Sequence, residues 1–160
     1  MPSKTAFITG ASSGIGQAAA HQFAAAGFDL IISARRKSRI DELSRLLVEQ
    51  HGVEVLALEL DVRDQGAVQE SIGLLPKKWQ TIDVLINNAG LSRGLVTIDK
   101  GLISDWDEMI DTNVKGLLYV SRAVTPLMVK RQAGHIINIG SIAGHEVYAN
   151  GAVYCASKHA

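Results

Sequence analysis

The chain has 160 residues, 16 basic and 16 acidic side chains, 47% hydrophobic residues and one cysteine, which fits one globular domain that folds without disulfides or a structural metal. A formal net charge of zero argues against nucleic-acid and anionic-membrane partners, because both need an electropositive field, and leaves a small-molecule substrate as the expected partner. The single cysteine and the short apolar stretch near the N-terminus predict a cytoplasmic protein without a secretory signal or membrane span.

Five short apolar runs are the candidate strands. Most of them show no alternation with polar residues, as expected when helices cover both faces of a parallel sheet. They alternate with longer amphipathic stretches, which predicts an α/β fold with a doubly wound, Rossmann-like parallel sheet. The predicted strands are 5–9, 28–33, 53–60, 83–87 and 135–140.

Two helices between these strands have recognisable ends. Ser38 followed by Asp41 is a variant of the capping box and predicts a helix start, with Gly52 as the expected stop. Asp64 is the expected opening of the next helix, which Pro76 helps to close. The polar loops beyond the strands then fall at the carboxyl edge of the sheet, where ligands bind in doubly wound folds.

The longest predicted helix covers residues 104 to about 131. Its apolar side chains are spread over more than one face, so we expect it to pack on the sheet and on another subunit. We therefore predict a homo-oligomer, either a dimer or a tetramer. Pro126 lies inside this span and is expected to kink or interrupt the helix.

A glycine-rich turn follows the first predicted strand and leads into a helix. Such a turn presents free backbone N–H groups and the positive end of a helix dipole to a pyrophosphate. The glycine spacing differs from the G-x-G-x-x-G fingerprint, so a tight strand–helix turn with glycines used for packing stays open as an alternative. The candidate cofactor-binding residues of the turn are Gly10, Ser12, Ser13, Gly14, Ile15 and Gly16.

Arg35 and Arg36 directly follow the second predicted strand. An acidic residue at this place accepts a hydrogen bond from the ribose 2′-hydroxyl, whereas arginine suits a 2′-phosphate. The pair therefore favours NADP over NAD. The alternative is a solvated basic start to the next helix.

Small or polar residues also stand where the third and fourth predicted strands end. Asp61 and Val62 follow one strand, and Asn88, Ala89 and Gly90 follow the other. An adenine or ribose fits at this edge of the sheet. For the asparagine segment, a purely structural turn with local side-chain to backbone hydrogen bonds is the alternative.

Tyr154 and Lys158 are four residues apart near the C-terminus, which places both on one helix face. A nearby ammonium favours the phenolate form of a tyrosine, so Tyr154 can act as a general acid and base. From the spacing alone, an ordinary surface tyrosine and lysine stays open as the alternative. Ser141, after the fifth strand, can donate to a substrate carbonyl oxygen. Asn113, inside the long helix, can anchor a water in a proton path or bond its own backbone.

Together these segments resemble the short-chain dehydrogenases/reductases, and the resemblance covers essentially the whole chain. It rests on the glycine-rich turn at residues 9–16, on Asn87-Asn88-Ala89-Gly90, and on single residues in the family's order. The resemblance implies one dinucleotide-binding domain over residues 1–160 that uses a nicotinamide cofactor. The single residues that carry it are Asp61, Asn113, Ser141, Tyr154 and Lys158.

The resemblance also implies a role for each catalytic candidate. Tyr154 is the implied proton donor or acceptor, and Lys158 promotes its ionisation and holds the nicotinamide ribose, so both count as cofactor-binding as well. Ser141 is implied to orient the carbonyl or alcohol, and Asn113 to support the proton relay. Hydride transfer itself belongs to the cofactor.

A closer resemblance is to the NADP-dependent branch that oxidises short 3-hydroxy acids such as serine or 3-hydroxyisobutyrate. It is carried by residues 33–36, 106–116 and 134–141. The implied activity is hydride transfer between nicotinamide and the carbinol or carbonyl carbon of a small hydroxy or keto compound. A reductase of 3-oxoacyl groups on a carrier protein is the nearest enzymatic alternative.

The sequence ends at Ala160, soon after Lys158. Members of the family continue past the tyrosine helix into further strands and a substrate-covering segment, so we expect this chain to lack them. Two other interpretations stay open beside an active enzyme. One is a dinucleotide-binding module without catalysis, and the other is a piece of a longer oxidoreductase.

Overall fold

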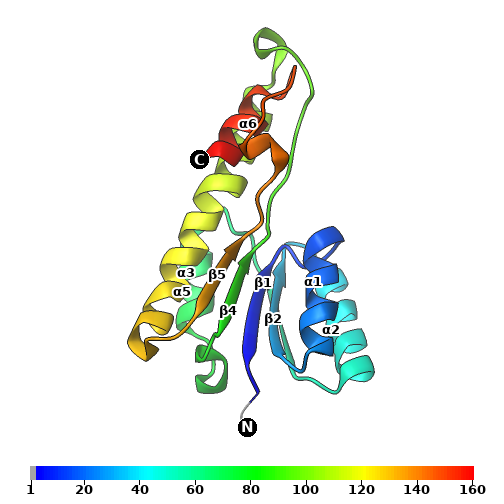
Figure 1. Cartoon of the computed structure of the whole chain (residues 1–160), viewed down its shortest axis with the longest axis vertical. Helices are drawn as coiled ribbons and strands as arrows, with labels where there is room; N and C mark the ends of the chain where they lie inside the picture. The colour runs from blue at the N-terminus through cyan, green and yellow to red at the C-terminus, as the bar shows by residue number, and fades with distance from the viewer. Residues whose placement is uncertain (1–2) are drawn as a thin grey trace.

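One parallel sheet organises the fold in the computed structural model, which describes residues 3–160 (Figure 1). Its strands lie in the order β3-β2-β1-β4-β5, and every neighbouring pair is parallel. The reversal of strand order at β1 confirms the predicted doubly wound, Rossmann-like sheet. The strands are β1 (Thr5–Thr9), β2 (Asp29–Ala34), β3 (Val55–Glu59), β4 (Val84–Asn87) and β5 (His135–Asn138).

The strand limits match the prediction at β1 and shift elsewhere. β2 reaches one residue further than predicted because Ala34 pairs with Glu59 of β3. β3 and β5 are shorter than predicted, since each lies at an edge of the sheet and pairs with one neighbour only. β5 ends at Asn138, which lies opposite Asn87, the last residue of β4.

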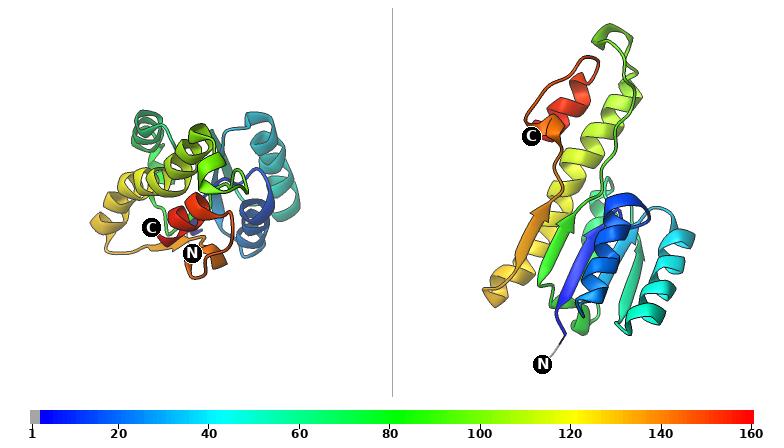
Figure 2. Two further views of the ribbon diagram at one scale, coloured as in Figure 1. Left: turned by 90° about the horizontal axis from the view of Figure 1, so that it is seen from above. Right: turned by 45° about the vertical axis from the view of Figure 1, so that its right-hand side comes forward.

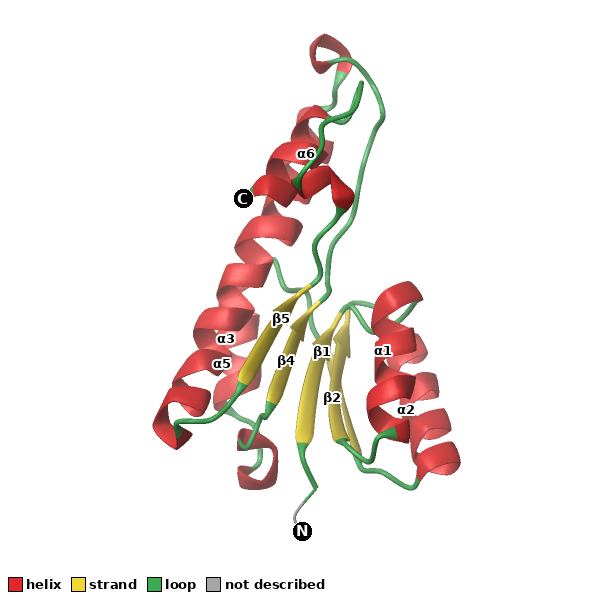
Figure 3. Cartoon of the chain, in the orientation of Figure 1, coloured by secondary structure: helices red, strands yellow, loops and turns green. Residues whose placement is uncertain are grey.

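Helices cover both faces of the sheet (Figures 2 and 3). Successive strand residues point to opposite faces, so Ile8 joins the core under α1 and α2, whereas Phe7 joins the core under α3 and α5. Both side chains are fully buried. The helices of these layers are α1 (Gly14–Ala25), α2 (Lys37–His51), α3 (Gln65–Gly73) and α5 (Leu117–Arg131).

The predicted ends of α2 and α3 are partly confirmed. Gly52 ends α2 in the left-handed conformation, with φ 68°, and the Asp64 carboxylate caps α3 by accepting from the Ala67 N–H at 2.9 Å. The Ser38 cap is wrong, because α2 already begins at Lys37. The Asp41 carboxylate pairs with the Lys37 ammonium at 2.8 Å instead of closing a capping box. α3 ends at Gly73, before Pro76.

The long predicted helix is continuous, but it departs from α-helical geometry at a different place than the predicted kink at Pro126. α5 passes through Pro126 without interruption, although proline has no N–H to donate to the preceding turn. The buried side chains of Val124 and Met128 on either side pack against the sheet and hold the helix there. The departure from α-helical geometry is instead a π-helical turn at Asp111–Gly116, which joins α4 (Ile103–Ile110) to α5.

The chain segments after β4 and β5 rise beyond the carboxyl ends of these strands and meet α6 (Ala152–His159) above the sheet (Figures 1 and 3). This brings α6 next to α4 and to the π-helical turn. Polar loops therefore gather at the edge of the sheet where the sequence predicts a ligand. Within residues 3–160, no helix is both long and apolar enough to cross a membrane.

Candidate functional site

The glycine-rich turn between β1 and α1 packs directly on the chain that follows β4. A Cβ atom at Gly10 would lie 2.8 Å from the Ala89 Cα, and one at Gly16 would lie 2.4 Å from the Asn88 side-chain nitrogen. Gly14, at φ 58°, has open space where its Cβ would be. The turn therefore has a packed side and an open side, and the open side fits a pyrophosphate at the N-terminus of α1.

Thr9 and Asn88 hold this turn in place. The Thr9 hydroxyl accepts hydrogen bonds from the backbone N–H groups of Asn88 and Ala89, each at 3.1 Å. The Asn88 amide donates to the carbonyl oxygens of Thr9 at 2.9 Å and Gly10 at 3.1 Å. The Asn88 amide thus fixes the turn, and Thr9, which is not among the predicted cofactor-binding residues, fixes it from the other side.

Substituting Gly16 tests this packing. A Gly16→Ala variant is expected to lose about 1–3 kcal/mol of unfolding free energy, because the new methyl group overlaps Asn88 and the Gly10 carbonyl oxygen. Urea unfolding followed by circular dichroism measures the loss. Gly73→Ala is the matched control, since a Cβ there meets nothing within 4 Å among the described residues. Equal stability of the two variants would contradict the packing.

One cavity of about 340 Å³ lies over the ends of β2 and β3. Arg36 is fixed at its rim, because one terminal nitrogen donates to the hydroxyls of Ser12 at 3.0 Å and Ser13 at 3.3 Å. The structure thus joins the arginine pair to the glycine-rich turn. Nearly all predicted cofactor residues of this end line the cavity: Gly10, Ser12, Ser13, Arg35, Arg36, Asp61, Val62, Ala89 and Gly90.

The Asp61 carboxylate in this cavity is already paired with Arg63. The Arg63 Nε lies 3.0 Å from each Asp61 oxygen, and its backbone N–H donates to Oδ1 at 3.1 Å. Partial burial works to raise the pKa of Asp61, but the hydrogen bonds and charge of Arg63, with Arg35 further off, hold it below its usual value. Asp61 therefore presents a fixed, ionised carboxylate to the cavity.

Thr112 is a further residue of this cavity that the sequence analysis missed. It belongs to the π-helical turn and lines the cavity beside Val62. Its hydroxyl is buried and finds no hydrogen-bond partner within residues 3–160. A buried polar atom without a partner fits a site completed by a polar ligand.

A second cavity of about 300 Å³ continues the first toward β5. Its lining brings Tyr154 and Lys158 of α6 together with Ile15 and Gly90. The Lys158 ammonium donates to the Ile139 carbonyl oxygen at 3.1 Å, which holds it at the end of β5. The two cavities share Gly10, Ser13, Ala89, Gly90 and Leu91.

The Asn113 side chain connects the loop after β4 to α6. Its oxygen accepts from the Leu91 N–H at 2.8 Å, and its nitrogen donates to the Leu91 carbonyl oxygen at 2.8 Å and the Ser157 hydroxyl at 3.0 Å. The alternative that it bonds its own backbone is therefore wrong. Because Ser157 adjoins Lys158, Asn113 positions the helix that carries the tyrosine and the lysine.

Ser141 lies beyond β5, next to Gly140, which lines the second cavity. It begins a short helical turn, Ile142–Gly144, and its hydroxyl oxygen accepts from the Ala143 N–H at 3.2 Å. The hydroxyl hydrogen is thus left to donate elsewhere. Ser141 is itself not among the residues that line the cavity within the described range, so the structure brings it near Tyr154 and Lys158 without showing contact.

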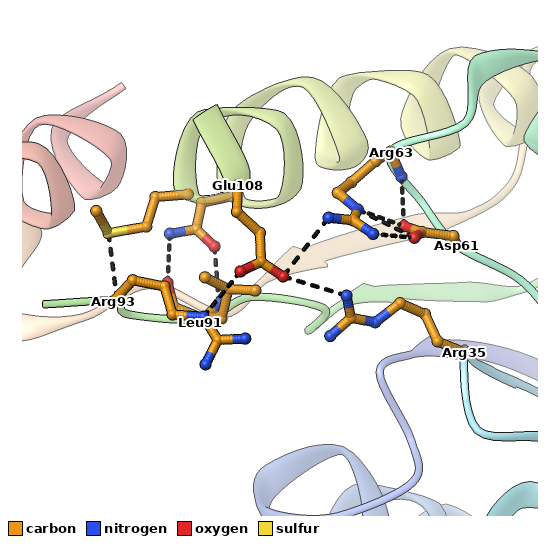
Figure 4. A network of polar contacts seen from close by, with 8 residues as sticks. Arg35, Asp61, Arg63, Leu91, Arg93 and Glu108 are labelled. Atoms are coloured by element: carbon orange, nitrogen blue, oxygen red, sulfur yellow. Dashed lines mark hydrogen bonds and ion pairs between the residues drawn. The ribbon is translucent and has the colours of Figure 1, made fainter. Parts of the chain in front are cut away.

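Glu108 of α4 forms ion pairs with three arginines (Figure 4). Its carboxylate lies 3.3 Å from Arg35, 3.5 Å from Arg63 and 2.8 Å from the Arg93 Nε. The hydrogen bond from Arg93, aided by Arg35, outweighs partial burial and lowers the pKa of Glu108. These ion pairs join segments that lie far apart in the sequence, so the hydrophobic periodicity of the sequence could not predict them.

Comparison with known proteins agrees with this geometry. The family described as short chain dehydrogenase matches residues 4–160. The NADP-dependent 3-hydroxy acid dehydrogenase YdfG of Salmonella typhi is 48% identical over 151 residues, which are 94% of this chain and 59% of that protein. An NADP-dependent 3-hydroxy acid dehydrogenase of Schizosaccharomyces pombe is 46% identical over 158 residues, 98% of this chain and 61% of that protein.

The chain is also similar to solved structures of dehydrogenases. The crystal structure of serine dehydrogenase from Escherichia coli has a TM-score of 0.90 and 44% identity, and the match covers 97% of this chain and 70% of that one. A closed form of serine dehydrogenase complexed with NADP+ also has a TM-score of 0.90, with 61% of that chain covered. The present chain spans about three-fifths of the length of the curated relatives it matches.

Proposed function

The chain belongs to the short-chain dehydrogenase family, and from this premise we propose that it is an NADP-dependent oxidoreductase of short 3-hydroxy acids. In this proposal, residues 1–160 form one dinucleotide-binding domain. The observation that carries the proposal is the pair of adjoining cavities, one lined by Arg35 and Arg36 and the other by Tyr154 and Lys158. Relatives named for NADP and for 3-hydroxy acids support it.

The residues present fit NADP along the whole length of the two cavities. Arg35 and Arg36 would hold a 2′-phosphate, because a guanidinium binds phosphate oxygens through two parallel N–H groups. The open side of the turn at Gly14 would hold the pyrophosphate. Bound NADP supplies the nicotinamide that accepts or returns the hydride.

Proton transfer falls to Tyr154 in this proposal. Lys158, one helical turn further along α6, lines the same cavity as Tyr154 and is held at the end of β5 by the Ile139 carbonyl oxygen. Tyr154 then takes the hydroxyl proton of the substrate during oxidation and gives it back during reduction. Ser141 donates its free hydroxyl hydrogen to the substrate oxygen, and Asn113 supports the relay by fixing α6 through Ser157.

Assembly and compartment are also parts of the proposal. We propose a homo-oligomer, a dimer or tetramer, in the cytoplasm. Support for assembly comes from α5, where Leu118 and Val129 are 57% and 67% exposed. A groove of about 460 Å³ between α3 and α5 adds Tyr119, Pro126 and Leu127 to this apolar surface.

Titration and turnover of the purified chain test the proposed function. We expect NADPH to bind more tightly than NADH in calorimetry, and NADP+ to be reduced, with rising absorbance at 340 nm, when 3-hydroxypropionate, 3-hydroxybutyrate or serine is added. A 3-oxoacyl thioester with NADPH is the comparison substrate. Faster turnover of the thioester would favour a reductase of carrier-bound acyl groups, and binding without any turnover would favour a dinucleotide-binding module.

A further inference from the structure

A short turn after β5 joins Ser141 to Gly144. The Ser141 hydroxyl oxygen accepts from the Ala143 N–H at 3.2 Å, and the Gly144 N–H donates to the Ser141 carbonyl oxygen at 2.9 Å. The Ala143 side chain is buried. Because these contacts hold the four residues in one conformation, a displacement of Gly144 also displaces Ser141.

Gly144 packs directly on the last turn of α6. A Cβ atom at Gly144 would lie 2.5 Å from the Lys158 carbonyl oxygen and 3.2 Å from its carbonyl carbon. Ordinary contacts begin at about 3.4 Å, so no side chain fits between this turn and the helix. Figure 1 shows the turn, in orange, beside α6. Gly140 in the same segment differs, because a Cβ there meets nothing within 4 Å among the described residues.

The segment around Ser141 contacts Lys158 at two places. The Lys158 ammonium donates to the Ile139 carbonyl oxygen at 3.1 Å, and the Lys158 backbone carbonyl lies against Gly144. Ile139 precedes Ser141 in the chain and Gly144 follows it. The position of Ser141 relative to α6 is therefore set by a contact on each side of it.

The Asn113 side chain supports α6 independently of this turn. It donates to the buried Ser157 hydroxyl at 3.0 Å, and that hydroxyl donates to the Tyr154 carbonyl oxygen at 2.8 Å. These hydrogen bonds join the helix to the loop after β4 and include no atom of Ser141. Gly144 is thus the residue through which the turn that carries Ser141 packs on the helix that carries Tyr154 and Lys158.

We propose that Gly144 is a positioning residue, which lets the Ser141 hydroxyl reach the same substrate oxygen as Tyr154 because it has no side chain. The inference rests on the proposed function, since it assumes the proposed roles of Ser141 and Tyr154. These two groups come from different elements, and both must lie at one oxygen atom. A methyl group at Gly144 would move the turn away from α6 by about 1 Å, and a misplacement of this size can lower a rate by about 10²-fold.

A Gly144→Ala variant tests the inference. We expect kcat for 3-hydroxybutyrate to fall by about 10²-fold. The dissociation constant for NADPH should stay the same in calorimetry, because the arginine pair and the glycine-rich turn line the other end of the site. In a Ser141→Ala background the same substitution should lower kcat much less, since the hydroxyl that Gly144 positions is already gone. Gly73→Ala on α3 is the matched control and should leave kcat unchanged.

Three kinetic outcomes would overturn the inference. The first is an unchanged kcat in Gly144→Ala. The second is a loss of kcat that is as large in the Ser141→Ala background as in the wild type, because Gly144 would then act without Ser141. The third is a loss of NADPH binding in Gly144→Ala, which would assign the glycine to the folding of the whole site.

Hydrogen–deuterium exchange separates failure of the inference from failure of the proposed function, because it requires no turnover. The amides of α6 should exchange faster in Gly144→Ala than in the wild type, whereas Gly73→Ala should leave them unchanged. Unchanged exchange in Gly144→Ala overturns the inference even in an inactive chain. If the wild type shows no turnover, faster exchange at α6 supports the inference, and the failure belongs to the proposed function.

Discussion

Replacing Tyr154 with phenylalanine is expected to lower kcat by about 10²- to 10⁴-fold, the usual contribution of a positioned general acid or base. The ring and its packing on α6 are kept, and only the hydroxyl that exchanges a proton with the substrate is lost. NADPH binding should change little, because the residues that would hold the phosphates stand at the glycine-rich turn and β2. Stopped-flow absorbance for turnover and calorimetry for binding measure the two quantities separately.

Tyr119→Phe is the matched control for this experiment. Tyr119 lies on α5 and lines the groove toward α3, away from both cavities of the site. Its substitution should leave turnover unchanged in the same assay. If Tyr154→Phe kept full activity, another group would have to carry the proton, and the proposed role of the Tyr154 and Lys158 pair would be abandoned.

Removing the arginine pair is expected to change cofactor choice. In the Arg35→Ala, Arg36→Ala double variant, NADPH should lose at least about 100-fold in affinity, because two charge-assisted contacts of about 1.5–3 kcal/mol each are lost together. NADH lacks the 2′-phosphate and should bind as to the wild type. Calorimetric titrations with both cofactors at one salt concentration give the ratio of the dissociation constants for NADPH and NADH, which measures cofactor choice.

The two single variants should differ from each other. Arg35 is shared with Glu108, so part of its charge is already neutralised, whereas the Arg36 guanidinium, within residues 3–160, hydrogen-bonds only to the neutral hydroxyls of Ser12 and Ser13. Arg36→Ala should therefore have the larger effect. Arg39→Ala, on the exposed side of α2, is the control. Equal losses for NADPH and NADH would indicate damage to the turn instead of loss of a phosphate contact.

Local patterns predicted the parts of the fold that depend on local chemistry. The uninterrupted apolar run of β1, the Asp64 cap and the left-handed Gly52 all follow from neighbouring residues. Edge strands were too long in the prediction, because an apolar run shows which residues favour a sheet but not how many find a partner. α5 continues through Pro126 because packing on the sheet compensates for one missing hydrogen bond.

The candidate site also has parts that short segments of sequence could predict and parts that depend on long-range contacts. The glycine-rich turn, the arginine pair and the tyrosine helix could be predicted because each lies within one short segment. Thr112, Glu108 and Arg93 could not, since their place in the site depends on α4 and the loop after β4 meeting above the sheet. Asn113 could be picked out as an unusual helix residue, but its partner Leu91 comes from that same long-range arrangement and could not be predicted.

The π-helical turn at Asp111–Gly116 has a consequence for how this protein tolerates insertions and deletions. Each residue of a regular helix turns the chain by about 100°, and a π turn accommodates one extra residue without disturbing what lies on either side. Deleting one residue here would convert the π turn into regular α-helix and keep α4 and α5 in place, whereas deleting a second residue would rotate α4 relative to α5 by about 100° and withdraw Glu108 from its arginines. The segment should thus accept the loss of one residue more readily than longer deletions over the course of evolution.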